Sequence, residues 1–343
     1  MSERETGAPT RIRTMEEFAA ASGISRPTLS RFFNDPQSVR KSSRVRIEEA
    51  MERFGYRPNL FATNFNRRSP KTLGIVIPSL MDPFYAGLVQ WIERHALAFG
   101  YWTVIQNSQG DPEREAEAVA TLMSLKVGGA IAIPLGYASR HGLFRQMADI
   151  MPLVFLDARP DAIGAFVGTD NRQSMGLMVD YLLRSGSSPS YFDMPDVNQN
   201  ARERRLAYET AMQEHGAEAT IFPVSRPGWE FERIAFEEAS GLIKSGALTG
   251  GTVLCANDRI AFGVMSAACQ SGLTTGRLAD LRVAGHDDHP LSQFACPPLT
   301  TVAQDVERLA RDSLECLMQG ISTGANAVVD HRLEAKLIMR ASA

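Results

Sequence analysis

Two hydrophobic patterns divide this chain near residue 70. Before that point apolar residues recur every three or four positions, which is the spacing of amphipathic helices. After it, short apolar runs alternate with helical segments such as Phe84–Phe99 and Pro112–Leu125. This alternation favours parallel sheets with helices on both faces, and the number of units fits two doubly wound lobes better than one. The predicted strands are Leu73–Ile77, Trp102–Gln106, Gly129–Ile133, Leu153–Leu156, Ala165–Gly168, Ser190–Asp193, Thr220–Phe222, Thr252–Cys255 and Leu281–Ala284.

The first 57 residues predict three helices. Thr14 can cap the first helix, and Glu17, three residues later, completes a capping box. A turn that contains Gly23 follows, after which Ser25 can cap a second helix. Two short helices joined in this way form a helix-turn-helix, whose second helix fits the major groove of DNA. The third helix, Ser43–Phe54, is expected to close the small core with Val45, Ile47, Ala50, Met51 and Phe54.

Composition narrows the class of protein. The 343 residues are 44% hydrophobic and 22% charged, as in ordinary globular proteins. No apolar stretch reaches the roughly 20 residues of a membrane-spanning helix, and the polar N-terminus lacks the apolar region of a secretory signal. The four cysteines are scattered without CxxC spacing, which is typical of reduced thiols. We therefore expect a cytoplasmic protein that does not associate with membranes.

Charge is distributed unevenly along the chain. Residues 1–71 carry 14 Lys and Arg against 8 Asp and Glu, whereas the remainder carries 22 against 31, for a net charge of −3. A basic head on an acidic body indicates that the head meets a polyanion such as nucleic acid. Charge alone fits an ordinary solvated surface equally well.

Several sequence motifs, which occur in a fixed order along the chain, point to one protein family. They read TMEEFAAASGISRPTLSRFFND, RIEEAMERFGYRPN, KTLGIVIPSLMDPFYAGLVQWIE, CANDRIAFGVM, VAGHDD and PPLTTVAQDVERLA. Together they resemble the lactose-repressor (LacI/GalR) family of bacterial transcription regulators over nearly the whole chain. The resemblance implies a DNA-binding head, a hinge helix and a two-lobed effector domain shaped like a periplasmic sugar-binding protein. It also implies a homodimer on a near-palindromic DNA operator.

The expected fold is α/β, with an all-α head, a hinge helix and a doubly wound, periplasmic-binding-protein-like domain of two lobes. We expect a disordered extension over 1–13, the helix-turn-helix over 14–57, the hinge helix and linker over 58–71, and the effector and dimerisation domain over 72–343. The N-lobe is expected at about 72–168 and 300–327, and the C-lobe at about 169–299 and 328–343.

The resemblance implies that bases are read from the start of the second helix, by Arg26, Pro27 and Arg31. Arginine can pair with guanine O6 and N7, whereas Pro27 offers only apolar contact. Phe65 matches a hinge position where the family usually has Leu, which wedges into the minor groove, and Ala62 matches a small residue between paired hinges. The other expected DNA contacts, which position the head or cap its helices, are Thr14, Ser25, Thr28, Ser30, Asn34, Ser43 and Asn59.

The resemblance also implies a ligand cleft between the lobes. Carboxylates accept paired hydrogen bonds from vicinal hydroxyls and arginine donates several, so the polar residues expected there suit a sugar, polyol or sugar acid. A purine corepressor remains open, and each aspartate could instead cap a helix. The expected effector residues are Asp82, Phe84, Tyr85, Asp170, Arg204, Trp229, Asp258 and Asp287.

Three other functions fit the sequence less well. The segment His286–His289, with two His and two Asp, could ligate a metal, but adjacent side chains at a strand end diverge. No P-loop, HExxH, GxSxG or GxGxxG motif is present, so we expect neither catalysis nor a cofactor. A solute-binding protein would fit the lobes but not the basic head. The favoured prediction is a transcriptional repressor controlled by a small effector, with control by a protein partner as an alternative.

Overall fold

The computed structural model describes residues 12–58, 70–160, 164–326 and 329–343. The chain divides into two compact units, residues 1–71 and 72–343. The hinge predictions for Asn59, Ala62 and Phe65 lie outside the described residues. Within the part of the chain that is described, no helix is long and apolar enough to cross a membrane.

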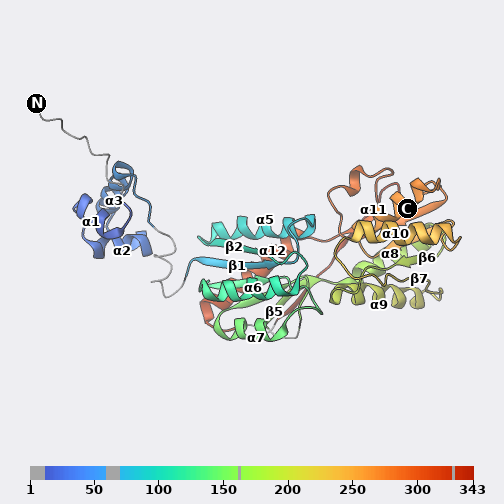
Figure 1. Cartoon of the computed structure of the whole chain (residues 1–343), viewed down its shortest axis with the longest axis horizontal. Helices are drawn as coiled ribbons and strands as arrows, with labels where there is room; N and C mark the ends of the chain where they lie inside the picture. Colours follow the sequence, from blue (N-terminus) through green and yellow to red (C-terminus); the bar gives the residue numbers. More distant parts are fainter. Residues whose placement is uncertain (1–11, 59–69, 161–163, 327–328) are drawn as a thin grey trace, which may run out of the picture. The chain divides into compact units, whose positions relative to one another are not determined.

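The head contains the three predicted helices, α1 (Met15–Ser22), α2 (Arg26–Asn34) and α3 (Lys41–Phe54), with a short 3-10 turn η1 (Pro36–Ser38) (Figure 1). The predicted capping box is present: the Thr14 hydroxyl accepts from the Glu17 amide at 3.1 Å, and the Glu17 carboxylate accepts from the Thr14 amide at 3.2 Å. The Ser25 side chain caps α2 as predicted. Gly23 ends α1 at φ 65°, a conformation that L side chains rarely adopt.

The core of the head differs from the prediction in two details. Val45 is 44% exposed, because it lies about 200° around α3 from the fully buried Ile47 and cannot share its face. The expected disordered extension is wrong for its last two residues. Ile12 packs against the core, and the Arg13 amide donates to the Glu17 carboxylate at 2.7 Å. The buried residues of this core are Phe18, Ile24, Leu29, Phe32, Val39, Ile47 and Tyr56.

The N-lobe is built on a six-stranded parallel sheet in the order β11-β5-β4-β3-β1-β2. Helices α5 (Pro83–Ala98) and α12 (Val306–Thr323) cover one face and pack on each other, while α6 (Pro112–Ser124) and α7 (His141–Ile150) cover the other (Figure 1). Its strands are β1 (Thr72–Ile77), β2 (Trp102–Asn107), β3 (Gly129–Ala132), β4 (Leu153–Leu156), β5 (Ala165–Thr169) and β11 (Asp330–Leu333).

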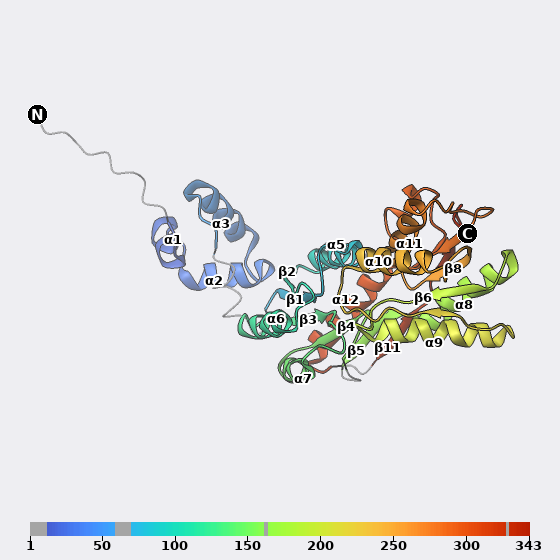
Figure 2. The same ribbon diagram turned by 45° about the vertical axis from the view of Figure 1, so that its right-hand side comes forward.

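The C-lobe has a four-stranded parallel sheet in the order β7-β6-β8-β9. Its helices form two packed pairs on opposite faces: α8 (Asn171–Ser185) with α9 (Gln199–Glu214), and α10 (Phe231–Lys244) with α11 (Asp258–Gln270) (Figure 2). All nine predicted strands are therefore present, within two residues at either end. The strands of this lobe are β6 (Pro189–Phe192), β7 (Ile221–Phe222), β8 (Gly251–Cys255) and β9 (Leu281–Ala284).

Three short strands near the C-terminus were not predicted, and they correct the lobe boundaries. β10 (Thr301–Ala303) pairs with β12 (Lys336–Ile338) and bonds to the end of β9, so it belongs to the C-lobe and not to the N-lobe. β11 pairs with β5 in the N-lobe sheet, although we expected residues 328–343 in the C-lobe. The chain therefore crosses between lobes after β5, after β10 and after β11, and residues at these crossings lie next to the cleft.

Candidate functional site

Arg204 is the centre of a buried polar network between the lobes. Its side chain comes from α9, and only 4% of the residue is exposed. Nε donates to Asn171 Oδ1 at 3.1 Å, Nη1 to the Ala256 carbonyl at 2.9 Å, and Nη2 to Asp287 Oδ1 at 3.0 Å. A guanidinium removed from water is stable only when its donors are paired, so these three contacts fix its orientation.

Asp287 is the carboxylate that balances this arginine. It follows β9 and has φ 111°, an unfavourable backbone conformation of the kind that concentrates at functional sites. Burial by itself would raise the pKa of Asp287, but the Arg204 charge and the His286 hydrogen bond hold the pKa below its usual value. Gln304, at the crossing after β10, also donates to Asp287 Oδ1 at 2.7 Å. The carboxylate is therefore ionised at neutral pH and shared between several donors.

His286 is a fully buried partner of Asp287. Burial and the nearby Arg204 charge lower the pKa of His286 to about 4, so the ring is neutral at physiological pH. Because Asp287 can only accept, Nδ1 carries the proton and donates at 2.8 Å, while Nε2 faces the Ser174 hydroxyl at 2.9 Å. Both ring nitrogens are occupied. Among the described residues no group of three or more His, Cys, Asp or Glu is placed to hold a metal ion.

A second ion pair joins the two lobes directly. Asp82 caps α5 of the N-lobe, with Oδ1 accepting from the Phe84 amide, and Oδ2 accepts from Arg259 Nη1 at 3.0 Å. Arg259 stands at the start of α11 in the C-lobe and also forms a two-point pair with Glu232, at 2.7 and 2.6 Å. The Asp82 and Arg259 side chains are only 10% and 16% exposed. We call this contact the cross-lobe ion pair.

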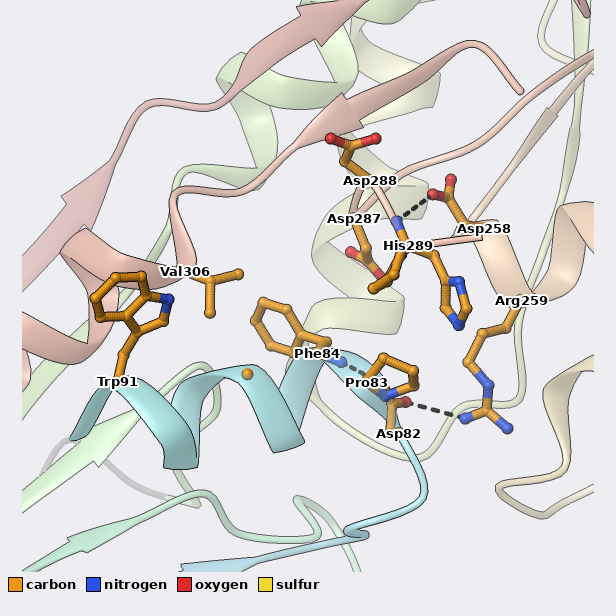
Figure 3. Close-up of a pocket in the computed structure, with 12 residues that line it drawn as sticks. Asp82, Pro83, Phe84, Trp91, Asp258, Arg259, Asp287, Asp288, His289 and Val306 are labelled. Carbon is orange, nitrogen blue, oxygen red and sulfur yellow. Dashed lines mark hydrogen bonds and ion pairs between the residues drawn. The ribbon is translucent and has the colours of Figure 1, made fainter. Parts of the chain in front are cut away.

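A cavity of about 210 Å³ lies beside the cross-lobe ion pair. In Figure 3 Asp82 and Arg259 face each other, while the Phe84 ring projects beside Val306. Polar groups from the C-lobe therefore face apolar groups from α5 and α12 across this space. The cavity is lined by Asp82, Pro83, Phe84, Gly87, Trp91, Asp258, Arg259, Asp287, Asp288, His289, Pro290 and Val306.

Trp229 forms an aromatic contact across the same cleft. It comes from the C-lobe, and its ring centroid lies 6.5 Å from that of Tyr85 on α5 and 5.7 Å from that of Phe231. Gly110, an N-lobe residue with φ 74°, approaches the indole so closely that a Cβ there would lie 2.7 Å from Trp229 Cδ1. Trp229 and Tyr85, both predicted effector residues, thus contact each other from opposite lobes, although neither lines the cavity described above.

Two of the predicted effector-binding aspartates, Asp170 and Asp258, use their carboxylates in hydrogen bonds within the protein. Asp170 caps α8 by accepting from the Gln173 amide at 3.0 Å, and it lines a shallow depression between α8 and α9 instead of the cavity. Asp258 borders the cavity, but its oxygens accept from the His289 amide and from the Ser292 and Thr301 hydroxyls, at 2.6 to 2.7 Å. It holds the loop that presents Asp287.

Sequence reasoning missed Asp157, Gln304, Asn171 and Arg259. Asp157 follows β4 at φ 65°, accepts from the Tyr85 hydroxyl at 3.4 Å, and has its pKa raised to about 7 by burial. Asp157 could have been predicted from the sequence, because it follows a predicted strand, as Asp287 does. Gln304 stands at a crossing whose position the hydrophobic pattern did not show, whereas Asn171 lies at the start of α8, directly after the predicted residue Asp170.

Replacing Asp258 by asparagine tests the protonation of this buried carboxyl group. Burial raises the pKa of Asp258 to about 7 in the folded state, from 3.8. Between these values the folded protein keeps a proton that the unfolded chain has released, so stability falls as the pH rises from about 4 to about 7. Asp258→Asn lacks this dependence. We expect the free energy of unfolding of the wild type, relative to the variant, to fall by about 2 kcal/mol between pH 5 and 7.

Urea unfolding at several pH values measures this difference. A difference that stays constant over this range would show that Asp258 is ionised throughout, stabilised by its three donors.

Most of the predicted DNA-binding residues of the head lie on or next to α2, whereas Thr14 caps α1 and Ser43 lies on α3. Arg26, Pro27, Arg31 and Asn34 are exposed on this helix, whereas Thr28, Ser30 and Ser43 are half-buried. The hydroxyls of Ser25 and Thr28 lie 2.8 Å apart within the cap of α2, and that of Thr14 belongs to the cap of α1. These three hydroxyls therefore shape the helix ends.

Each of the two compact units matches a known protein family. Residues 14–59 match the family described as "Bacterial regulatory proteins, lacI family", and residues 179–343 match "Periplasmic binding protein-like domain". The chain is 26% identical over 317 residues to the HTH-type transcriptional repressor PurR of Haemophilus influenzae (strain PittEE), covering 91% of this chain and 92% of that one. It is 27% identical to the ribose operon repressor of Escherichia coli (strain K12), covering 91% and 94%.

Among solved structures, the Lac repressor dimer bound to operator and the anti-inducer ONPF superposes with a TM-score of 0.83 at 25% identity, covering 96% of this chain and 98% of that one. The match extends through both the head and the two lobes, whereas a plain solute-binding protein would account for the lobes alone. Motifs, fold and relatives agree: the chain belongs to the lactose-repressor (LacI/GalR) family of DNA-binding transcriptional repressors.

Proposed function

We propose that this repressor binds a near-palindromic operator as a homodimer in the cytoplasm, and that an uncharged, hydroxyl-bearing effector in the interlobe cleft controls its affinity for DNA. The observation that carries the effector part is the buried network of Arg204, Asp287 and Gln304, which joins residues of the C-lobe to a crossing between lobes. A ligand seated against this network can change DNA affinity only through its differential affinity for two arrangements of the lobes.

The charge balance favours an uncharged effector over a sugar acid. Arg204 pairs with Asp287, and Arg259 pairs with both Asp82 and Glu232. Among the described residues that border the cleft, these two arginines thus have their charge already compensated by carboxylates. An anionic ligand would have to displace a carboxylate from its arginine, whereas a sugar or polyol can add hydrogen bonds to the existing pairs. Phe84, which lines the cavity, offers an apolar face for a ring.

A thermal-shift screen against sugars, polyols, sugar acids and purines tests the effector class. A ligand at about 100 times its dissociation constant stabilises the native state by about 2.7 kcal/mol, which moves the unfolding midpoint by roughly 5 to 11 °C. Operator binding with and without the hit then distinguishes inducer from corepressor. A selective response to a sugar acid or a purine would contradict the uncharged, hydroxyl-bearing class, and a response only to a partner protein would contradict a small effector.

Dimerisation has a candidate surface in the N-lobe. β2 is an edge strand of the six-stranded sheet, and three large apolar residues near it, Leu97, Phe99 and Trp102, are 59%, 51% and 58% exposed. Exposed apolar residues gathered at one place mark interaction surfaces. Sedimentation equilibrium measures whether the chain is dimeric at the concentrations used for DNA binding.

Replacing Arg26 by alanine is expected to reduce operator affinity more than affinity for unrelated DNA. A bidentate arginine–guanine contact contributes about 1–3 kcal/mol of discrimination, so the ratio of specific to nonspecific binding falls by roughly 5- to 150-fold. Arg46→Ala removes the same charge from an exposed position on α3 and serves as the matched control. Both variants are measured at one salt concentration. If Arg26→Ala lowers the affinity for operator DNA and for unrelated DNA equally, Arg26 does not read bases.

A further inference from the structure

The proposed base-reading residue Arg26 has a carboxylate partner on the neighbouring helix. Arg26 is the first residue of α2, and its Nη2 lies 2.9 Å from Oε1 of Glu16 on α1. Both side chains stay accessible, with 67% and 60% of their surface exposed. The pair therefore lies on the outside of the helix-turn-helix, where it can meet DNA.

The position of Arg26 explains why it needs a partner. A helix N-terminus carries a partial positive charge, which disfavours a cation there. The first turn of α2 contains no acidic residue, so the nearby Glu16 supplies the compensating charge from another helix. Pro27, the next residue, has no polar group with which to steer the guanidinium.

Glu16 stands on a firmly anchored helix. The next residue but one, Phe18, is fully buried and stacks on Tyr56 with a centroid distance of 4.2 Å. The capping box between Thr14 and Glu17 fixes the start of the same helix. The backbone that carries the Glu16 carboxylate is thus held by the core, so the carboxylate can restrict the directions available to a long, flexible arginine.

We propose that Glu16 is a positioning residue that holds Arg26 for base reading and so raises sequence discrimination. This inference rests on the proposed reading of bases by Arg26. Arginine has five N–H donors, and the contact with Glu16 engages Nη2, which leaves donors for guanine O6 and N7. If Arg26 turned to a phosphate, Glu16 would lose its partner beside a polyanion, so the pair also disfavours nonspecific contacts.

Selection from a library of DNA duplexes tests this role, because the protein itself then picks out the sequences that it prefers. The library carries two randomised half-sites, and the full-length wild type, Arg26→Ala, Glu16→Ala, the double variant and Glu48→Ala are selected at one salt concentration. Glu48 is an exposed acid on α3, so Glu48→Ala removes the same charge without touching Arg26. Circular dichroism confirms that each head is folded.

The wild type is expected to enrich a two-fold symmetric motif, and Arg26→Ala to lose the preference at one symmetric pair of positions. Glu16→Ala should weaken the preference at those same positions about two- to fivefold, the range of an exposed ion pair, while Glu48→Ala leaves it unchanged. The double variant should match Arg26→Ala. These results support the proposal, because a general charge effect would change affinity without relaxing one base-pair position.

Three other outcomes would each contradict a different part of the proposal. If Arg26→Ala relaxes a position and Glu16→Ala does not, the positioning role is overturned while base reading by Arg26 stands. If Arg26→Ala leaves the motif intact, the premise fails and the proposal falls with it. If the wild type enriches no motif, the proposed sequence-specific binding itself is wrong.

Discussion

Arg204→Met will lower the free energy of unfolding of residues 72–343 by about 3–5 kcal/mol, whereas Arg205→Met, one residue away, will cost less than about 1 kcal/mol. The first substitution leaves Asp287 as a buried charge without its main partner and removes the donors to Asn171 and to the Ala256 carbonyl. Arg205 has 46% of its side chain exposed, and its two ion pairs are long, at 3.3 and 3.4 Å. Solvent replaces those contacts at little cost.

A double variant identifies the cause of the loss. In Arg204→Met/Asp287→Asn the unpaired charge is gone, so the double variant should be more stable than Arg204→Met alone. Thermal or urea unfolding measures all four proteins, and the expected loss for Arg204→Met corresponds to roughly 6 to 20 °C in the unfolding midpoint. Equal effects of Arg204→Met and Arg205→Met would mean that the network between the lobes contributes little to stability.

The fold was largely predictable because its strands are buried on both faces. A parallel strand covered by helices is a short apolar run between polar segments, and β1 and β4 have this pattern without interruption. β11 and β12 escaped because their residues are mostly half-buried or exposed, and Asp330, His331 and Arg332 carry polar groups. The lobe boundaries depend on β10 and β11, and because neither strand was predicted, the boundaries were misplaced at these two points.

The site was predictable only where a residue follows a recognisable strand or begins a helix. Asp287 satisfies that rule, whereas Asp82 and Arg204 came from the family resemblance. Asp258 satisfies it too, yet its carboxylate accepts hydrogen bonds from the segment that follows β9. Arg259 was missed because its importance comes from partners on other elements, Asp82 and Glu232, and no local pattern shows which residues the fold brings together.

The cross-lobe ion pair gives the effector domain a direct means of holding the cleft closed. Asp82→Asn is expected to open the cleft, because it removes the charge that reaches Arg259 but keeps an N-cap for α5, since asparagine caps helices as well as aspartate does. Glu232→Gln is the matched control: it weakens a pair of the same arginine that lies within the C-lobe and does not join the lobes. A loss of about 2 kcal/mol changes the ratio of closed to open molecules about 30-fold.

Trp229 reports the result, because it is a C-lobe residue packed against Tyr85 and Gly110 of the N-lobe. In a background where Trp91 and Trp102 are replaced by phenylalanine, Asp82→Asn should shift the emission to longer wavelength and increase quenching by acrylamide. Glu232→Gln should leave both close to the reference. If both variants behave alike, the charge on Arg259 matters but the link between lobes does not. If neither changes the emission, the aromatic contact closes the cleft without the ion pair, and effector binding must act through the Arg204 network alone.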